Sequence, residues 1–288
     1  MRAQDIRLNA HGKIDHRISR QLAGFTRSDD PPNRVKPVPI QVVYHIVLKA
    51  WTTMPPDPGM HAVADMTCIG YYYLMRPGEH TFSSNNTPFK IQDVKLYHQG
   101  TLVDWQLANQ ATLATVDSAS LTFTTQKNGV KGEIIAHSCS GHSSVCPVKS
   151  LIRRLRYHRF LGSPLDAPLG RFYDEQGNRR HVTSKMVTMA LRASLTELDP
   201  LGTKYDIKPQ DIEARSLRAG GATALLCAGV DTDLIQLMGR WKSDAMIRYL
   251  HISAHPHLGS FAKKMFHAAY DFVPIITEVP ANPQDDDE

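Results

Sequence analysis

A short stretch near the C-terminal end of the chain holds the side chains best suited to chemistry on a phosphodiester. Within 35 residues it contains Arg215, Arg218, Trp241 and Tyr249. A guanidinium is always charged and presents a planar fork of N–H donors that matches the oxygens of a phosphate. A tyrosine hydroxyl can act as an oxygen nucleophile and form a covalent phosphate ester. The stretch could therefore bind a phosphodiester and cut it.

Three helices are expected to position these side chains. The first is predicted over residues 210–228 and ends at Gly229, the residue type most often found in the left-handed C-terminal cap. A short second helix is stopped by Gly239, and Ser243 caps a third helix that carries Tyr249. The phosphate-binding groups and the nucleophile would thus lie on consecutive helices.

Apolar residues at helical spacing predict most of the remaining chain to be helical as well. Helices are expected over residues 40–51 and 61–75, and the second is ended by the Arg76-Pro77 pair because the residue before proline is pushed out of helical geometry. Cys146-Pro147 begins a basic helix that runs through Phe160, either to contact DNA phosphates or simply to present a solvated face. After a loop, a further helix runs from about residue 181 to 198.

Residues 90–136 have a different pattern, with alternating apolar and polar positions and many β-branched side chains. Strands are predicted over residues 91–97, 120–125 and 130–136. The Asn128-Gly129 pair between the last two is the strongest short signal for a hairpin turn. The expected fold class is therefore mainly α with a small antiparallel β-sheet (α+β).

The charge balance favours a polyanionic partner. The chain of 288 residues has a formal net charge of +5 and a pI near 9.0. Its last four residues, Asp285 to Glu288, are all acidic, so the remaining body is more basic than the total indicates. A basic body of this kind is typical of nucleic-acid binding.

Cysteine usage and the N-terminal sequence bear on localisation. The four cysteines form no C-x-x-C pair, which predicts neither a disulfide framework nor a zinc ribbon. The histidines and cysteines between His137 and Cys146 match no common zinc spacing, so no metal is expected. No apolar segment of signal-peptide or membrane-spanning length is present. We expect a soluble intracellular protein, nuclear if the host is eukaryotic and cytoplasmic otherwise, with no membrane partner.

The run from Ala214 to His251 resembles the C-terminal half of tyrosine recombinases, the phage-integrase-like family, particularly the divergent versions in eukaryotic mobile elements. That family carries a His-x-x-Arg motif, then a His or Trp, then the nucleophilic Tyr about nine residues later. On this resemblance, Arg218 is the second phosphate-binding arginine and Tyr249 is the nucleophile.

Two upstream segments extend the resemblance to roughly residues 37–270. Leu74 to Glu79 is similar to the first-arginine motif, which would make Arg76 a phosphate-binding arginine and Glu79 a support for the local structure. Lys127, on the predicted hairpin turn, occupies the place of the family's catalytic lysine. Lys131 fits that place less well.

The sequence departs from the family pattern at two positions. Arg215 stands where the family has the histidine of His-x-x-Arg, which keeps a hydrogen-bond donor but loses a group that shuttles protons near neutral pH. At the His/Trp position, Arg240 has the expected spacing of nine residues from Tyr249, whereas Trp241 has the expected residue type. We favour Trp241.

The resemblance implies DNA strand cleavage and rejoining, in site-specific recombination or integration. Arg76 and Arg218 would clamp the scissile phosphate, Tyr249 would attack it to give a 3′-phosphotyrosyl bond, and Lys127 would protonate the departing 5′ oxygen. Neither ATP nor a metal ion is required, so no cofactor is expected. The implied partner is double-stranded DNA, with a homotetramer possible on it. Further DNA contacts are expected from Lys131, Arg240 and Lys242.

The expected domain organisation leaves the activity open. Residues 1–36 form a basic segment and linker, 37–274 the recombinase-like catalytic domain and 275–288 an acidic tail. Residues 1–36 are too short for the family's N-terminal DNA-binding domain. One alternative is therefore a catalytically impaired DNA-binding protein derived from a mobile-element recombinase. A helical protein-interaction domain is the other.

Overall fold

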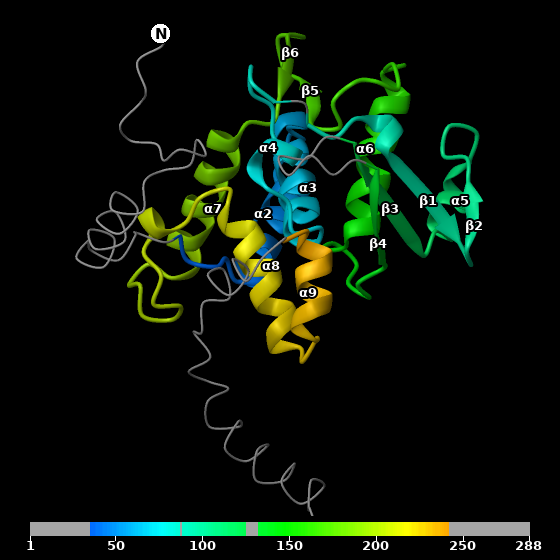
Figure 1. The fold of residues 1–288 in the computed structure, drawn as a ribbon. Coiled ribbons are helices and arrows are strands. Elements are labelled where there is room, and N and C mark those ends of the chain that lie inside the picture. Colours follow the sequence, from blue (N-terminus) through cyan, green and yellow to red (C-terminus); the bar gives the residue numbers. More distant parts are fainter. Residues whose placement is uncertain (1–34, 87, 125–131, 242–288) are drawn as a thin grey trace, which may run out of the picture. The chain divides into compact units, whose positions relative to one another are not determined.

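The computed structural model describes residues 35–86, 88–124 and 132–241 (Figure 1). The chain divides into two compact units, Met1–Val35 and Lys36–Glu288, and the fold described below belongs to the second. Its described residues form eight α-helices and six short strands. The predicted class, mainly α with a small antiparallel sheet, is confirmed. None of the described helices is long and apolar enough to cross a membrane.

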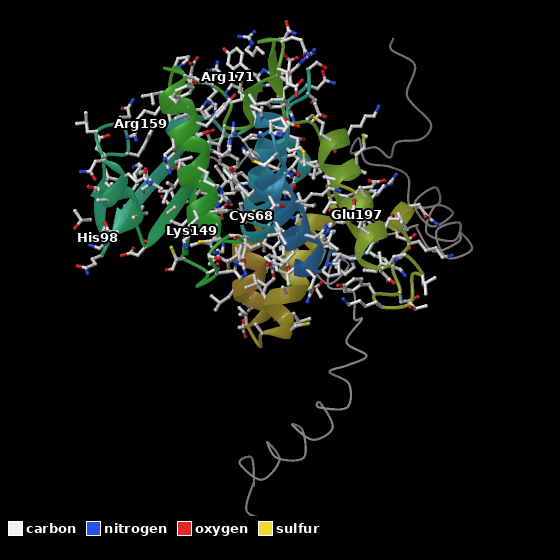
Figure 2. The ribbon with its side chains drawn as sticks, turned by 180° about the vertical axis from the view of Figure 1, so that it is seen from behind. Cys68, His98, Lys149, Arg159, Arg171 and Glu197 are labelled. Atoms are coloured by element: carbon white, nitrogen blue, oxygen red, sulfur yellow. The ribbon has the colours of Figure 1, made fainter. Side chains whose placement is uncertain are left out.

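The central helix is α3 (Pro58–Tyr72), most of which is buried. It begins three residues earlier than predicted because Asp57 caps it, accepting a hydrogen bond from the Gly59 amide at 2.7 Å, and Pro58 suits the first helical position. Figure 2 places Cys68 of α3 between the surrounding helices. Those packed against α3 include α2 (Ile40–Thr52), α6 (Pro147–Phe160), α7 (Ser184–Leu198) and α8 (Ser216–Cys227).

The segment after α3 differs from the prediction. The helix ends at Tyr72, and Leu74 adopts a positive φ of 49°, so the backbone leaves helical geometry well before Arg76. Pro77–His80 then forms a short helix of its own, α4, with Arg76 as its N-cap residue. The Glu79 carboxylate closes this turn by accepting a hydrogen bond from the Arg76 amide at 2.7 Å. Arg76-Pro77 therefore begins a helix instead of ending one.

A four-stranded antiparallel sheet in the order β2-β1-β3-β4 lies on one side of α6 (Figure 1). Its strands are β1 (Val94–His98), β2 (Thr101–Val103), β3 (Ser118–Phe123) and β4 (Glu133–Ser138). Three of them lie within or close to the predicted ranges, while the three-residue β2 was not predicted. The short helix α5 (Gln110–Ala114) precedes β3. Phe123 pairs with Glu133, and the predicted hairpin turn between them lies outside the described residues.

Helices α6 and α7 follow the predicted ranges closely. Arg159 and Lys149 mark the two ends of α6 in Figure 2. Between the helices lies a two-stranded ribbon, β5 (Arg171–Tyr173) with β6 (Arg179–His181), where only a loop was expected. Thr183 caps α7 by accepting a hydrogen bond from the Met186 amide at 3.3 Å.

The helix predicted over residues 210–228 is shorter than expected. Pro209–Asp211 forms a single 3₁₀ turn, and α8 begins only at Ser216, whose hydroxyl accepts a hydrogen bond from the Glu213 amide at 3.0 Å. Its end agrees with the prediction, since Gly229 follows with a φ of 79°. The next helix, α9 (Thr232–Gly239), packs against α8.

Candidate functional site

Three arginines from distant parts of the chain meet at the segment that joins α3 to α4. Arg76 lies in that segment, Arg218 comes from the first turn of α8, and Arg240 follows the end of α9. We call these three residues the arginine cluster. Arg218 and Arg240 share one acceptor, the carbonyl oxygen of Leu74, and Arg76 and Arg240 share one carboxylate, that of Glu79.

Arg218 is buried, with 3% of its surface exposed. Its Nη1 donates to the Leu74 carbonyl oxygen at 2.6 Å, and its Nη2 donates to the Gly239 carbonyl oxygen. The guanidinium carbon lies 4.0 Å from the centre of the Trp241 ring. Bonds to two backbone segments and stacking on an indole hold this side chain in one orientation.

Two glycines explain how α8 comes close enough for these bonds. A Cβ at Gly221 would overlap the carbonyl oxygen of Tyr71, and a Cβ at Gly220 would overlap that of Val38. Glycine at both positions therefore permits a close approach of backbone that no other residue would allow. The approaching backbone belongs to α3 and to the segment before α2.

Arg240 is also buried, with 4% exposed, and adopts the left-handed conformation with a φ of 57°. This turn directs its Nη2 to Glu79 Oε2 at 2.9 Å and its guanidinium over the Phe123 ring, 3.6 Å from the centre. Burial lowers the pKa of Arg240, while the carboxylates of Glu79 and Glu133 act in the opposite direction. The described contacts of Arg240 are with its own chain, and its contact with DNA stays a prediction.

Arg76 is the member of the cluster nearest to solvent. Its side chain is 27% exposed, and Nη1 donates to Glu79 Oε1 at 3.0 Å. Glu79 itself is 9% exposed and bonds Arg76 through one oxygen and Arg240 through the other. The supporting role predicted for Glu79 is confirmed, because this carboxylate ties two arginines of the cluster together.

The two candidates for the His/Trp position, Trp241 and Arg240, have different surroundings in the structure. Trp241 is 9% exposed and its ring stacks over Arg218, whereas Arg240 turns away towards Glu79 and Phe123. Of the two side chains, the indole is therefore the one stacked on the second predicted phosphate-binding arginine.

Arg215 differs from the three arginines of the cluster in its exposure and in its partner. Its side chain is 54% exposed and forms an ion pair with Glu213 at 2.9 Å. It is the N-cap residue of α8, less than one turn before Arg218. A guanidinium at this position donates hydrogen bonds but lacks the imidazole nitrogen through which a histidine relays a proton.

The other predicted site residues lie outside the described part of the chain. They are Lys127, Lys131, Lys242 and Tyr249. Their roles as general acid, DNA contacts and nucleophile stay predictions.

His80, which sequence reasoning did not single out, lies directly beneath the cluster. It is completely buried, and its Nδ1 lies 3.1 Å from the Arg76 carbonyl oxygen. Burial lowers the pKa of His80 to about 4, so the imidazole is neutral at physiological pH. No pattern in the sequence signals this, because a histidine in a polar turn is ordinarily exposed.

The basic helix α6 divides its arginines between the surface and the interior: Arg156 and Arg159 are exposed, and whether they contact DNA phosphates stays a prediction. Arg154 is buried and donates to the carbonyl oxygens of Leu169 and Arg171, and Arg153 forms an ion pair with buried Asp65 at 2.6 Å. These two guanidiniums therefore stabilise the fold through contacts within the chain.

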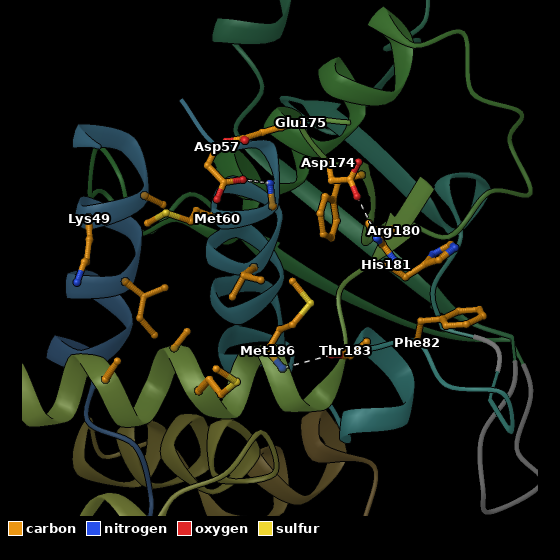
Figure 3. A pocket seen from close by; sticks show the side chains of 18 of the residues that line it. Lys49, Asp57, Met60, Phe82, Asp174, Glu175, Arg180, His181, Thr183 and Met186 are labelled. Atoms are coloured by element: carbon orange, nitrogen blue, oxygen red, sulfur yellow. Dashed lines mark hydrogen bonds and ion pairs between the residues drawn. The ribbon is translucent and has the colours of Figure 1, made fainter. Parts of the chain in front are cut away.

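An open pocket of about 960 Å³ lies between α2, α3, α7 and the β5-β6 ribbon (Figure 3). Met60, Phe82 and Met186 contribute apolar surface, and Asp57 and Arg180 are among its polar lining residues. Arg76, Arg215, Arg218, Arg240 and Trp241 are absent from its lining. The pocket and the arginine cluster are separate places.

Comparison with known proteins gives similarity of structure only. No protein-family model matches the chain, and no curated protein matches its sequence. Among solved structures, the chain is similar to the XerA recombinase, with 16% identity over 82% of this chain and 68% of the other and a TM-score of 0.48. It is also similar to the XerH site-specific recombinase bound to its difH substrate, with 14% identity over 78% and 53% and a TM-score of 0.47.

A third similar structure is the complex of Flpe with a Holliday junction, at 12% identity over 80% of this chain and 50% of the other and a TM-score of 0.42. The chain thus spans about half the length of the XerH and Flpe chains. Because these scores lie below 0.5, the function proposed next depends on the side chains of this protein.

Proposed function

We propose that the chain cleaves and rejoins DNA strands through a 3′-phosphotyrosyl intermediate on Tyr249. The observation that supports this proposal is the convergence of Arg76, Arg218 and Trp241, from three separate segments, at one turn of the chain. Fixed guanidiniums next to an indole form a preorganised site for the charge that develops on a phosphodiester during nucleophilic attack.

Each residue has a defined part in the proposed reaction. Arg76, at the surface of the cluster, contacts a non-bridging oxygen of the scissile phosphate, and Arg218 stabilises the pentacoordinate transition state from its fixed position. The Tyr249 hydroxyl gives up its proton to solvent as its oxygen attacks phosphorus, the bond to the 5′ oxygen breaks, and Lys127 donates a proton to that oxygen. Rejoining reverses these steps with another 5′ hydroxyl, and the energy of the bond is kept in the phosphotyrosine.

Trapping on a nicked suicide substrate tests the proposal. When the short 5′-hydroxyl strand diffuses away after cleavage, the wild-type chain should remain covalently attached to the DNA and migrate as a heavier band on a denaturing gel. Tyr249→Phe should give no such band because it lacks the nucleophilic oxygen. Tyr44→Phe is the matched control: Tyr44 is 39% exposed on α2, and this variant should trap as the wild type does. Equal trapping by Tyr249→Phe would refute the assignment of the nucleophile.

One observation favours a second candidate, a DNA-binding protein that no longer cuts. Arg215 is paired with Glu213 and lacks the imidazole that relays a proton at this position in the family pattern. Such a protein would bind DNA with an affinity that falls steeply as salt rises, yet give no covalent band with any suicide substrate. An Arg215→His variant separates the two: a covalent band that appears only in this variant means that binding was kept and proton transfer was lost.

A further inference from the structure

Two cysteines face each other across the short loop between β4 and α6. Cys139 directly follows β4, and Cys146 is the N-cap residue of α6. The amide of Ser140, one peptide unit after Cys139, lies 3.5 Å from the Cys146 sulfur. Cys146 is also among the groups that raise the pKa of the Cys139 thiol, as expected for adjacent sulfurs. Both are free thiols in this structure.

Hydrogen bonds within the loop hold the two cysteines in this arrangement. The Ser140 hydroxyl donates to the Val145 carbonyl oxygen at 2.7 Å, which closes the loop just before Cys146. Inside it, the amides of Ser144 and Val145 both donate to His142 Nδ1 at 3.1 Å. A loop closed by its own side chains keeps its two ends together, and therefore keeps the thiols together.

The environments of the two thiols differ in a way that suits stepwise oxidation. Cys139 is exposed, whereas Cys146 is fully buried. Burial acts to raise the pKa of Cys146, but donors that include the Lys149 and Ser140 amides outweigh it and lower the pKa below its ordinary value. Burial and the neighbouring Cys146 raise the pKa of Cys139 to about 11. A reagent from solution can reach only the first sulfur, and the second is the better thiolate.

We propose that Cys139 and Cys146 are a reversible thiol–disulfide site that reacts with low-molecular-weight disulfides such as glutathione disulfide. The Cys139 thiol gives up its proton to solvent and its sulfur attacks one sulfur of the reagent. The reagent's S–S bond breaks, and a glutathione thiolate leaves and takes up a proton. The Cys146 thiolate then attacks the Cys139 sulfur and displaces the second glutathione thiolate. Two protein thiols are oxidised, and one glutathione disulfide is reduced to two glutathiones.

The test uses the full chain, reduced and then incubated with excess glutathione disulfide, followed by peptide mapping with mass spectrometry. We expect a Cys139–Cys146 disulfide, with no glutathione left on either residue. Cys227, the other exposed cysteine, is an internal control and should retain its glutathione. Because the two sulfurs are neighbours, loss of glutathione from Cys139 should be more than about tenfold faster than from Cys227.

Variants separate the two steps. Cys146→Ala should leave glutathione stably attached to Cys139, and Cys139→Ser should leave Cys146 unmodified because the reagent cannot reach it. Glutathione that persists on Cys139 in the wild type would overturn the proposal. So would a bond between Cys146 and buried Cys68, whose pKa burial raises to about 12. The wild-type map decides between these outcomes even if a variant fails to fold.

Discussion

Two regions of the molecule, helix α6 and the arginine cluster, bury arginine side chains against backbone carbonyl groups. The two regions differ in whether a neighbouring arginine is accessible to a ligand. In helix α6, Arg154 donates to the carbonyl oxygens of Leu169 and Arg171. In the arginine cluster, Arg218 donates in the same manner to those of Leu74 and Gly239. The local chemistry of the two guanidiniums is nearly the same.

The regions differ in what lies beside the buried group. Arg154 is 1% exposed, and its neighbour Arg153 turns inward to Asp65. In the arginine cluster, Arg76 keeps 27% of its side chain exposed, so a charged donor remains within reach of a ligand. Two arginines of the more basic segment, Arg153 and Arg154, are thus structural, although Arg156 and Arg159 of the same helix are exposed. The number of charges in a segment therefore does not show which of its arginines a ligand can reach.

Among the substitutions that test this contrast, the largest change in the free energy of unfolding is expected for Arg154. Arg154→Met should lower the free energy of unfolding by about 3–5 kcal/mol. The Arg171 carbonyl group loses this donor, the Leu169 carbonyl group keeps only its bond to His158, and buried Asp65 loses one of its two nearby arginines. Urea denaturation measures this change. Arg156→Met on the same helix is the control. Arg156 is exposed with a bond to Gln110, so that variant should cost under about 0.5 kcal/mol. Equal costs would contradict the structural role of Arg154.

Each region also contains a buried neutral histidine, and this gives a pH test. Burial lowers the pKa of His80 to about 4, and burial with nearby Arg154 does the same for His158. Between pH 6.5 and 4 the unfolded chain binds protons that the folded chain refuses, so the free energy of unfolding falls as pH falls through this window. Each histidine should contribute up to roughly 3 kcal/mol of this loss.

Denaturation curves at a series of pH values, compared between wild type, His80→Gln and His158→Gln, measure these contributions. Each variant should have a shallower loss of stability between pH 6.5 and 4, and all three should vary alike above pH 7. A wild-type slope that persists in both variants would mean that other groups cause the acid sensitivity.

Oxidation of the cysteine pair should stabilise the α6 region by a smaller amount. A bond that closes the short loop from Cys139 to Cys146 is expected to raise the free energy of unfolding by about 2 kcal/mol, because it restricts the unfolded chain. Urea denaturation of the oxidised and reduced protein measures the difference, and the same oxidation of Cys146→Ala should change nothing. A destabilising effect would show that the native loop must distort to form the bond.

Substitution of Arg76 should change the free energy of unfolding least but should strongly reduce covalent trapping of DNA. Its ion pair is partly exposed, and Glu79 keeps Arg240 as a partner, so Arg76→Ala should cost no more than about 1 kcal/mol. The covalent DNA band of the suicide assay should nevertheless be lost. Arg76→Lys retains the charge without the planar fork and should recover part of the band. Full trapping by Arg76→Ala would remove Arg76 from the proposed site.

Sequence patterns predicted helix boundaries that are set by the residues at the boundary itself. The start of α6 at Cys146-Pro147 and the end of α8 at Gly229 depend on residues at those positions. The three-residue strands β2, β5 and β6 were not predicted, because so short a segment carries no measurable periodicity and its pairing is decided by distant contacts.

The candidate site was predictable by residue type but not by environment. The pattern around Arg76 and Arg218 indicated phosphate chemistry, and nothing in it showed that Arg218 would be almost fully buried or that Arg240 would turn to Glu79. These outcomes depend on the left-handed turns at Leu74 and Arg240, two residue types that rarely adopt a positive φ. Tertiary packing imposes both turns.

The packing of Trp241 against Gly239 makes these two positions genetically interdependent. The indole occupies the volume that a Cβ at residue 239 would need, so any larger residue there must displace the ring from Arg218. Gly239→Ala should therefore be harmful with tryptophan at 241 and far less so in a Trp241→Ala background, a strong positive epistasis between neighbours. Evolutionary paths that exchange the tryptophan for a smaller side chain should do so before, and not after, the glycine changes.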